Sequence, residues 1–115
     1  VYGGPGHQEV LAQMSRRLID QWIADQGFIV VGIDGRGTPH RGRDWERATY
    51  KKFGTLALDD QVKGLNLLLA KHPEMDGDRV GIYGWSFGGY MSAMAALREP
   101  KVFKAAVAGA PVTEW

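Results

Sequence analysis

The stretch RVGIYGWSFGGYMSAMAALR, residues 79–98, decides the fold, because a strand pattern passes directly into a helix pattern there. Residues 79–83 (RVGIY), with the β-branched Val80 and Ile82, predict a short strand, and residues 87–98 are rich in alanine and methionine. Between them, GWSFG (84–88) has the form G-x-S-x-G. A serine at such a sharp turn has a strained backbone and projects its hydroxyl from the edge of a sheet. The pattern therefore predicts Ser86 as a nucleophile with a positive or strained φ.

The same turn predicts how negative charge beside Ser86 is stabilised. The backbone N–H of Phe87 should point into the space that the serine hydroxyl faces, and the helix N-terminus adds partial positive charge there. The alternative is a glycine-rich turn in which Ser86 only caps the helix. The strand–turn–helix context and the additional Gly89 favour the catalytic interpretation.

Strand and helix patterns alternate along the rest of the chain. Residues 28–33 (FIVVGI) form a continuous apolar run, which predicts a strand buried on both faces. The other predicted elements are helices over 8–26, 56–72 and 87–98, strands over 79–83 and 104–109, and a loop over 35–54. This alternation indicates crossover connections and a doubly wound parallel sheet.

The composition excludes several classes of function. The 115 residues carry a net charge of +1 and no cysteine, so we expect no nucleic-acid surface, disulfide or thiolate metal site. The histidines, His7, His40 and His72, share no metal-ligand spacing, and we predict no metal and no cofactor. Within these 115 residues, no apolar run approaches the ~18 residues of a membrane span, and none has the charged-then-apolar pattern of a signal segment.

The sequence does not supply a general base for Ser86 in the expected order. After a serine at such a turn, an acid and then a histidine follow along the chain. All three histidines precede Ser86, and the only acids after it are Glu99 and Glu114. We therefore expect either a segment of a longer catalytic domain or a catalytically inactive chain. The start at Val1 without Met and the abrupt end at Trp115 favour a segment, whose compartment the sequence does not reveal.

Four motifs resemble, in order, those of the dipeptidyl peptidase IV-like group in the prolyl oligopeptidase family of serine peptidases. They are VYGGPGHQ (1–8), DGRGT (34–38), GWSFGGY (84–90) and APVTEW (110–115). The resemblance covers the whole chain and implies a partial α/β-hydrolase fold, incomplete at both ends, with a mostly parallel sheet in three α/β/α layers. Residues 1–115 would then be the central part of a peptidase catalytic domain, and the propeller domain of such enzymes is absent from them.

The resemblance also implies roles for individual residues. Ser86 matches the nucleophile, the Phe87 N–H one oxyanion donor, and the Tyr2 hydroxyl the other. Phe87, Val112 and Trp115 match the walls of the pocket that takes a proline ring. Better-known members carry tyrosine at the Phe87 position, so one ring hydroxyl is missing here. Without the resemblance, Tyr2 would be interpreted as an aromatic residue packed under a glycine turn.

The implied activity is that of a serine exopeptidase. It would release N-terminal dipeptides after proline or alanine through an acyl-enzyme on Ser86, with a peptide as its only required partner. A prolyl tripeptidyl or acylaminoacyl peptidase of the same group is the alternative within hydrolases. A non-catalytic fragment or degenerate homologue is the alternative outside them, and we expect the 115 residues alone to be inactive. A homodimer of the full-length parent is left open.

Overall fold

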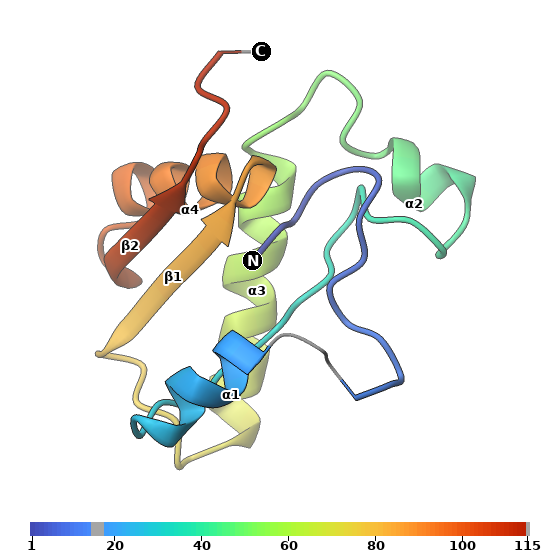
Figure 1. Ribbon diagram of the computed structural model, residues 1–115. Coiled ribbons are helices and arrows are strands. Elements are labelled where there is room, and N and C mark those ends of the chain that lie inside the picture. The colour runs from blue at the N-terminus through green and yellow to red at the C-terminus, as the bar shows by residue number, and fades with distance from the viewer. Residues whose placement is uncertain (15–17, 115) are drawn as a thin grey trace.

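The structure is a computed structural model that describes residues 1–14 and 18–114 (Figure 1). Its elements are α1 (Leu18–Asp25), α2 (Arg43–Arg47), α3 (Leu56–Lys71), β1 (Val80–Trp85), α4 (Phe87–Arg98) and β2 (Phe103–Gly109). The α/β class and the parallel pairing predicted from the sequence are confirmed. Within the described residues, none of the helices has the length and apolar character that crossing a membrane requires.

The sheet consists of β1 and β2, which run parallel and are connected by α4. Their register places Val80 opposite Phe103 and, after one shift, Trp85 opposite Gly109. The helix α4 packs against both strands and also contacts α3 (Figure 1). Because both strands end at the same edge of the sheet, the turn into α4 lies at the edge where parallel sheets place their ligands.

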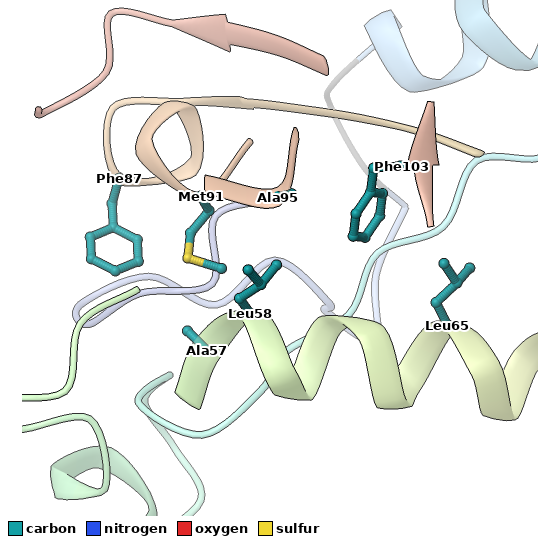
Figure 2. Close-up of a cluster of buried hydrophobic side chains, with 7 residues drawn as sticks. All are labelled: Ala57, Leu58, Leu65, Phe87, Met91, Ala95 and Phe103. Atoms are coloured by element: carbon teal, nitrogen blue, oxygen red, sulfur yellow. The ribbon is translucent and has the colours of Figure 1, made fainter. Parts of the chain in front are cut away.

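One hydrophobic core joins α3, α4 and the start of β2. Its buried members are Ala57, Leu58, Leu65, Phe87, Met91, Ala95 and Phe103. The α4 members recur at every fourth residue, which places them on one face of the helix. Figure 2 shows this face turned toward the leucines of α3. The first core residue of α4 directly follows Ser86, so the packing that stabilises the domain also holds the turn.

The predictions around residues 56–109 are confirmed with small shifts at the ends. The helix α4 has the predicted bounds, and α3 ends one residue earlier than predicted, with the N–H of His72 bonded to the carbonyl of Leu68. β1 spans 80–85 instead of 79–83, and β2 starts one residue earlier than predicted. Local signals such as Pro73 and the apolar periodicity were sufficient in this region.

The predicted helix over 8–26 is wrong for its first half. Residues 8–14 are not helical, residues 15–17 lie outside the described part, and only α1 forms. The N–H groups of Glu9 and Val10 donate to the carboxylate of Asp34 at 2.9 and 2.8 Å, so contacts with a residue 24 or 25 positions away fix the course of this segment. The apolar side chain of Val10 is half exposed and has no core to face.

The predicted strand over 28–33 is also wrong as a paired, buried strand. No ladder joins this segment to another in the described residues, and Phe28, Ile29 and Val31 are exposed. A cavity of about 800 Å³ is lined by this segment, by β1 and by Val1. Apolar β-branched composition favours an extended chain, but a strand also needs ladder hydrogen bonds from a neighbour, and none of the described segments supplies them here.

The predicted loop over 35–54 contains the short helix α2 and is folded on itself. The hydroxyl of Thr38 donates to the carbonyl of Gly35 at 2.8 Å, and the N–H of Gly37 donates to the carbonyl of Trp45 at 2.9 Å. Thr38 and Thr49 are buried despite the polar composition. The segment is thus an ordered loop with internal hydrogen bonds.

Two leucines of α3 test the placement of the core. Leu58→Ala should lower the free energy of unfolding by about 2–5 kcal/mol, because Leu58 is 2% exposed and its loss leaves a cavity. Leu67→Ala is the matched control, since Leu67 is 64% exposed, and should change stability by less than about 0.5 kcal/mol. Urea denaturation of the protein that carries this chain measures both. Equal effects would contradict the core described above.

Candidate active site around Ser86

Ser86 lies at a sharp turn between β1 and α4. Its backbone has φ 57° and ψ −116°, which confirms the predicted strain at this position. Its N–H donates to the carbonyl of Gly109 at 3.0 Å, and its carbonyl accepts from the N–H of Tyr90 at 3.0 Å. Both strands and the helix therefore fix the backbone on either side of the hydroxyl.

The hydroxyl of Ser86 is not used as a helix cap. Although Ser86 occupies the N-cap position of α4, its side chain makes no capping hydrogen bond. A serine whose role is to cap a helix bonds the N–H of the second or third helical residue. The capping alternative is therefore wrong, and the half-buried hydroxyl stays available beside the first-turn N–H groups of the helix.

The glycines around Ser86 are required by close backbone contacts. A Cβ on Gly84 or on Gly88 would collide with the carbonyl oxygen of Val1, and a Cβ on Gly89 would collide with that of Gly109. These contacts are with backbone atoms, which cannot move aside as a side-chain tip can. Glycine is the only residue without a Cβ, so the spacing of the motif follows from how closely three segments approach one another.

Tyr2 lies beside the turn although 84 positions separate it from Ser86 in the sequence. The nitrogen of Val1 donates to the carbonyl of Tyr83 at 2.7 Å, which holds the start of the chain along β1. The ring of Tyr2 lies 5.9 Å from the ring of Phe87, measured between centroids, and contacts the ring of His7 edge-on at 4.9 Å. The structure thus brings Tyr2 and Phe87 together next to Ser86.

The three candidate residues of the proline pocket are Phe87, Val112 and Trp115, of which the two that the structure describes differ in burial. Phe87 is 3% exposed, and its ring packs against Tyr2, Phe53 and Tyr90 at centroid distances of 5.8–5.9 Å. Val112 is half-buried in the segment that follows β2. Trp115 lies outside the described residues. The pocket role of these three residues stays a prediction.

The histidines do not complete a catalytic triad in the described part of the chain. Among residues 1–14 and 18–114, no histidine hydrogen-bonds with the hydroxyl of Ser86. Nε2 of His7 lies 3.3 Å from a carboxylate oxygen of Glu9, and Nδ1 of His72 lies 3.1 Å from one of Glu74. The same described residues contain no group of three potential metal ligands. The described residues therefore supply candidates for a nucleophile and for oxyanion donors, but no candidate for the general base.

Sequence reasoning missed an ionic network that orders the turn after residue 33. Arg36 donates from Nε and Nη2 to the two carboxylate oxygens of Asp60, at 2.9 and 2.6 Å, and its backbone N–H donates to the same group at 2.8 Å. Burial raises the pKa of Asp60, but the hydrogen bonds and positive charge of Arg36 outweigh this and hold that pKa below its usual value. No local pattern signals this pair, because Arg36 and Asp60 lie 24 positions apart in the sequence.

A pair of glycine substitutions tests the close approach at the turn. Gly88→Ala should destabilise the protein by about 1–3 kcal/mol or more, because its Cβ would collide with the carbonyl oxygen of Val1 and backbone atoms cannot move aside as a side-chain tip can. Gly81→Ala is the control within β1, since its Cβ would lie 3.7 Å from the nearest atom, an ordinary contact. Thermal unfolding of both variants measures the difference. A Gly88→Ala protein as stable as Gly81→Ala would refute this packing.

Comparison with known proteins agrees with the geometry. The Prolyl oligopeptidase family profile matches residues 14–115. The chain is 44% identical over 117 residues to dipeptidyl peptidase 8 of Homo sapiens. This match covers 100% of this chain and 13% of that protein. The chain is also 34% identical over 115 residues to prolyl endopeptidase FAP of Mus musculus, covering 100% of this chain and 15% of that protein.

A solved structure matches over the full length as well. It is described as a "putative dipeptidyl aminopeptidase IV" from Bacteroides ovatus, with a TM-score of 0.93 and 44% identity. The match covers 100% of this chain and 16% of that one. The chain thus spans less than a fifth of the length of the proteins that it resembles.

Proposed function

Because the chain belongs to the prolyl oligopeptidase family, we propose that residues 1–115 are the nucleophile-bearing central part of an α/β-hydrolase catalytic domain in a longer serine peptidase. The observation that carries the proposal is the conformation of Ser86. Its positive φ and its uncommitted hydroxyl, at the junction of a strand and a helix, are what an attacking serine requires. The proposed reaction releases dipeptides after proline or alanine from peptide N-termini.

The proposed chemistry is acyl transfer through Ser86. The serine oxygen bonds to the scissile carbonyl carbon while its proton passes to a general base. The carbon–nitrogen bond then breaks and the base returns the proton to the leaving amine, after which water hydrolyses the ester. We assign the base to a part of the parent outside these 115 residues. No cofactor or metal takes part in this scheme.

The proposed oxyanion site uses one donor from each end of the chain. The N–H of Phe87 belongs to the first turn of α4. N–H groups of this turn point along the helix axis beyond its N-terminus, where they contribute a partial positive charge. The phenol of Tyr2 is the second proposed donor, and the ring contact between Tyr2 and Phe87 supports this pairing. A phenol is neutral at working pH, so it donates without a net charge.

The proposed specificity rests on apolar walls. Phe87, Val112 and Trp115 are assigned to the pocket for the proline ring, and the ring contacts of Phe87 with Phe53 and Tyr90 support an apolar environment at this place. The names of the relatives, dipeptidyl peptidase and prolyl endopeptidase, support a peptide substrate. A tripeptidyl or acylaminoacyl peptidase would use the same nucleophile, and substrate length separates these alternatives. A homodimer of the parent stays part of the proposal.

A non-catalytic homologue is the second candidate. The observation that favours it is the missing hydrogen bond between Ser86 and any of the three histidines in the described residues. Covalent labelling by a fluorophosphonate decides between the two, because only an activated serine reacts.

The experiment uses the full-length protein in two measurements. The fluorophosphonate labels the activated serine, and dipeptidyl, tripeptidyl and acyl-aminoacyl chromogenic substrates measure cleavage. We expect one labelled serine, cleavage of the dipeptidyl proline substrate, and a loss on the order of 10⁶ in kcat for Ser86→Ala. Ser92→Ala is the matched control on α4, since the Ser92 hydroxyl is buried and bonded to the carbonyl of Gly88 at 2.8 Å. An unlabelled wild-type protein, or one still labelled after Ser86→Ala, would overturn the proposal.

Tyr2→Phe tests the second oxyanion donor. In the full-length protein, it should lower kcat by roughly 10²–10³ and leave KM within about a factor of two, because the donor acts on the transition state. Tyr50→Phe is the control, since Tyr50 is 71% exposed on the long loop and should leave kcat unchanged. If Tyr2→Phe keeps full kcat, Tyr2 has only a packing role.

A further inference from the structure

The carboxylate of Asp34 holds two consecutive backbone N–H groups of the N-terminal segment. Oδ1 accepts from Glu9 at 2.9 Å and Oδ2 accepts from Val10 at 2.8 Å. Each carboxylate oxygen has its own donor. The two hydrogen bonds together therefore fix both the position and the orientation of the backbone at Glu9 and Val10. Hydrogen bonds to an ionised acceptor are about twice as strong as neutral ones. Asp34 has no part in the chemistry proposed above.

The segment that Asp34 holds is the one that carries Tyr2. Its first residue is fixed at β1, where Val1 donates to Tyr83 at 2.7 Å, and its end is fixed by Asp34. Between these two points the chain passes through Gly3 and Gly6, which have φ 71° and 78°. Backbone of this kind has many conformations when it is free, so the position of the Tyr2 ring depends on how both ends are held.

A continuous set of contacts runs from Asp34 to Tyr2. Glu9, whose N–H is held by Asp34, places a carboxylate oxygen 3.3 Å from Nε2 of His7, a close approach without a hydrogen bond between the two atoms. The ring of His7 contacts the ring of Tyr2 edge-on, at 4.9 Å between centroids. Tyr2 then packs on Phe87, at the foot of the turn that carries Ser86.

Asp34 is itself anchored to the core helix α3. The side chain of Gln61 donates to the carbonyl of Ile33 at 3.0 Å, directly before Asp34. On the other side, Arg36 makes its hydrogen bonds with Asp60, and Gly35 packs against the same carboxylate. The turn 33–36 is therefore held from both sides by residues of a helix that is part of the hydrophobic core.

From this geometry, we infer that Asp34 is a positioning residue for Tyr2, acting through Glu9 and His7. The inference rests on the proposed function, in which the Tyr2 phenol stabilises the oxyanion. A donor on a glycine-rich segment reaches the productive distance only if that segment is fixed to within a fraction of an ångström. Asp34 connects this segment to α3 by hydrogen bonds and so restricts its motion.

A double-mutant cycle on the full-length protein tests the inference. Asp34→Asn should lower kcat about 10- to 100-fold, the order of loss expected from a misplaced catalytic group, and leave KM within about a factor of two. In the Tyr2→Phe background, the same Asp34→Asn change should alter kcat by less than about twofold, since the donor that Asp34 positions is gone. Asp44→Asn, the same chemical change at an exposed acid of α2, should leave kcat unchanged in both backgrounds.

The outcomes separate the two proposals. If Tyr2→Phe alone leaves kcat intact, the oxyanion role of Tyr2 fails and the inference falls with it. If Tyr2→Phe lowers kcat but Asp34→Asn has no effect, or an equal effect in both backgrounds, the oxyanion role stands and the inference is overturned. Equal effects in both backgrounds would mean that Asp34 supports the fold in general.

Amide hydrogen exchange provides a readout that does not need activity. Asp34→Asn should speed exchange at Glu9 and Val10 while the amides of α3 keep their protection, and unchanged exchange at both positions overturns the inference. If Asp34→Asn does not fold, Val10→Pro carries the kinetic test. This variant deletes one of the two donated N–H groups and leaves Asp34 in place.

Discussion

The structure depends on one close backbone approach. The carbonyl of Val1 occupies the space that a Cβ on Gly84 or Gly88 would need, so the first residue of the chain lies directly against the turn that carries Ser86. This contact brings the N-terminal segment, β1 and α4 to one point. Any side chain at either glycine would separate them, and Tyr2 would move away from Phe87. The motif G-x-S-x-G is thus a packing requirement as well as a chemical signature.

Stability and the geometry of the site share residues. Phe87 begins α4, belongs to the hydrophobic core, and packs against the ring of Tyr2. Met91 and Ala95 continue the same face of the helix into the core (Figure 2). The strain at Ser86 is therefore held by packing on one side and by the hydrogen bond from Ser86 to Gly109 on the other. A strained serine persists only when its surroundings determine its position in this way.

A second anchor acts at a distance from the turn. The ion pair between Arg36 and Asp60 orders the segment after residue 33, and Asp34 extends from that segment to the backbone of Glu9 and Val10. The Arg36–Asp60 ion pair and the hydrogen bonds to Asp34 thus connect the core helix α3 to the N-terminal segment. Their donors and acceptors lie 24 or 25 positions apart in the sequence.

The sequence alone determined the elements whose signals are local. The turn at Ser86, the helices α3 and α4, and the strands β1 and β2 all follow from periodicity, glycine spacing and Pro73. Tertiary structure alone decided the course of residues 8–14 and 28–33. Asp34 binds the N–H groups of Glu9 and Val10 and so fixes the course of the first segment, and residues 28–33 found no ladder partner among the described segments. It also decided that Tyr2 lies beside Phe87, because a contact between residues 85 positions apart depends on how separate segments pack, which no local pattern encodes.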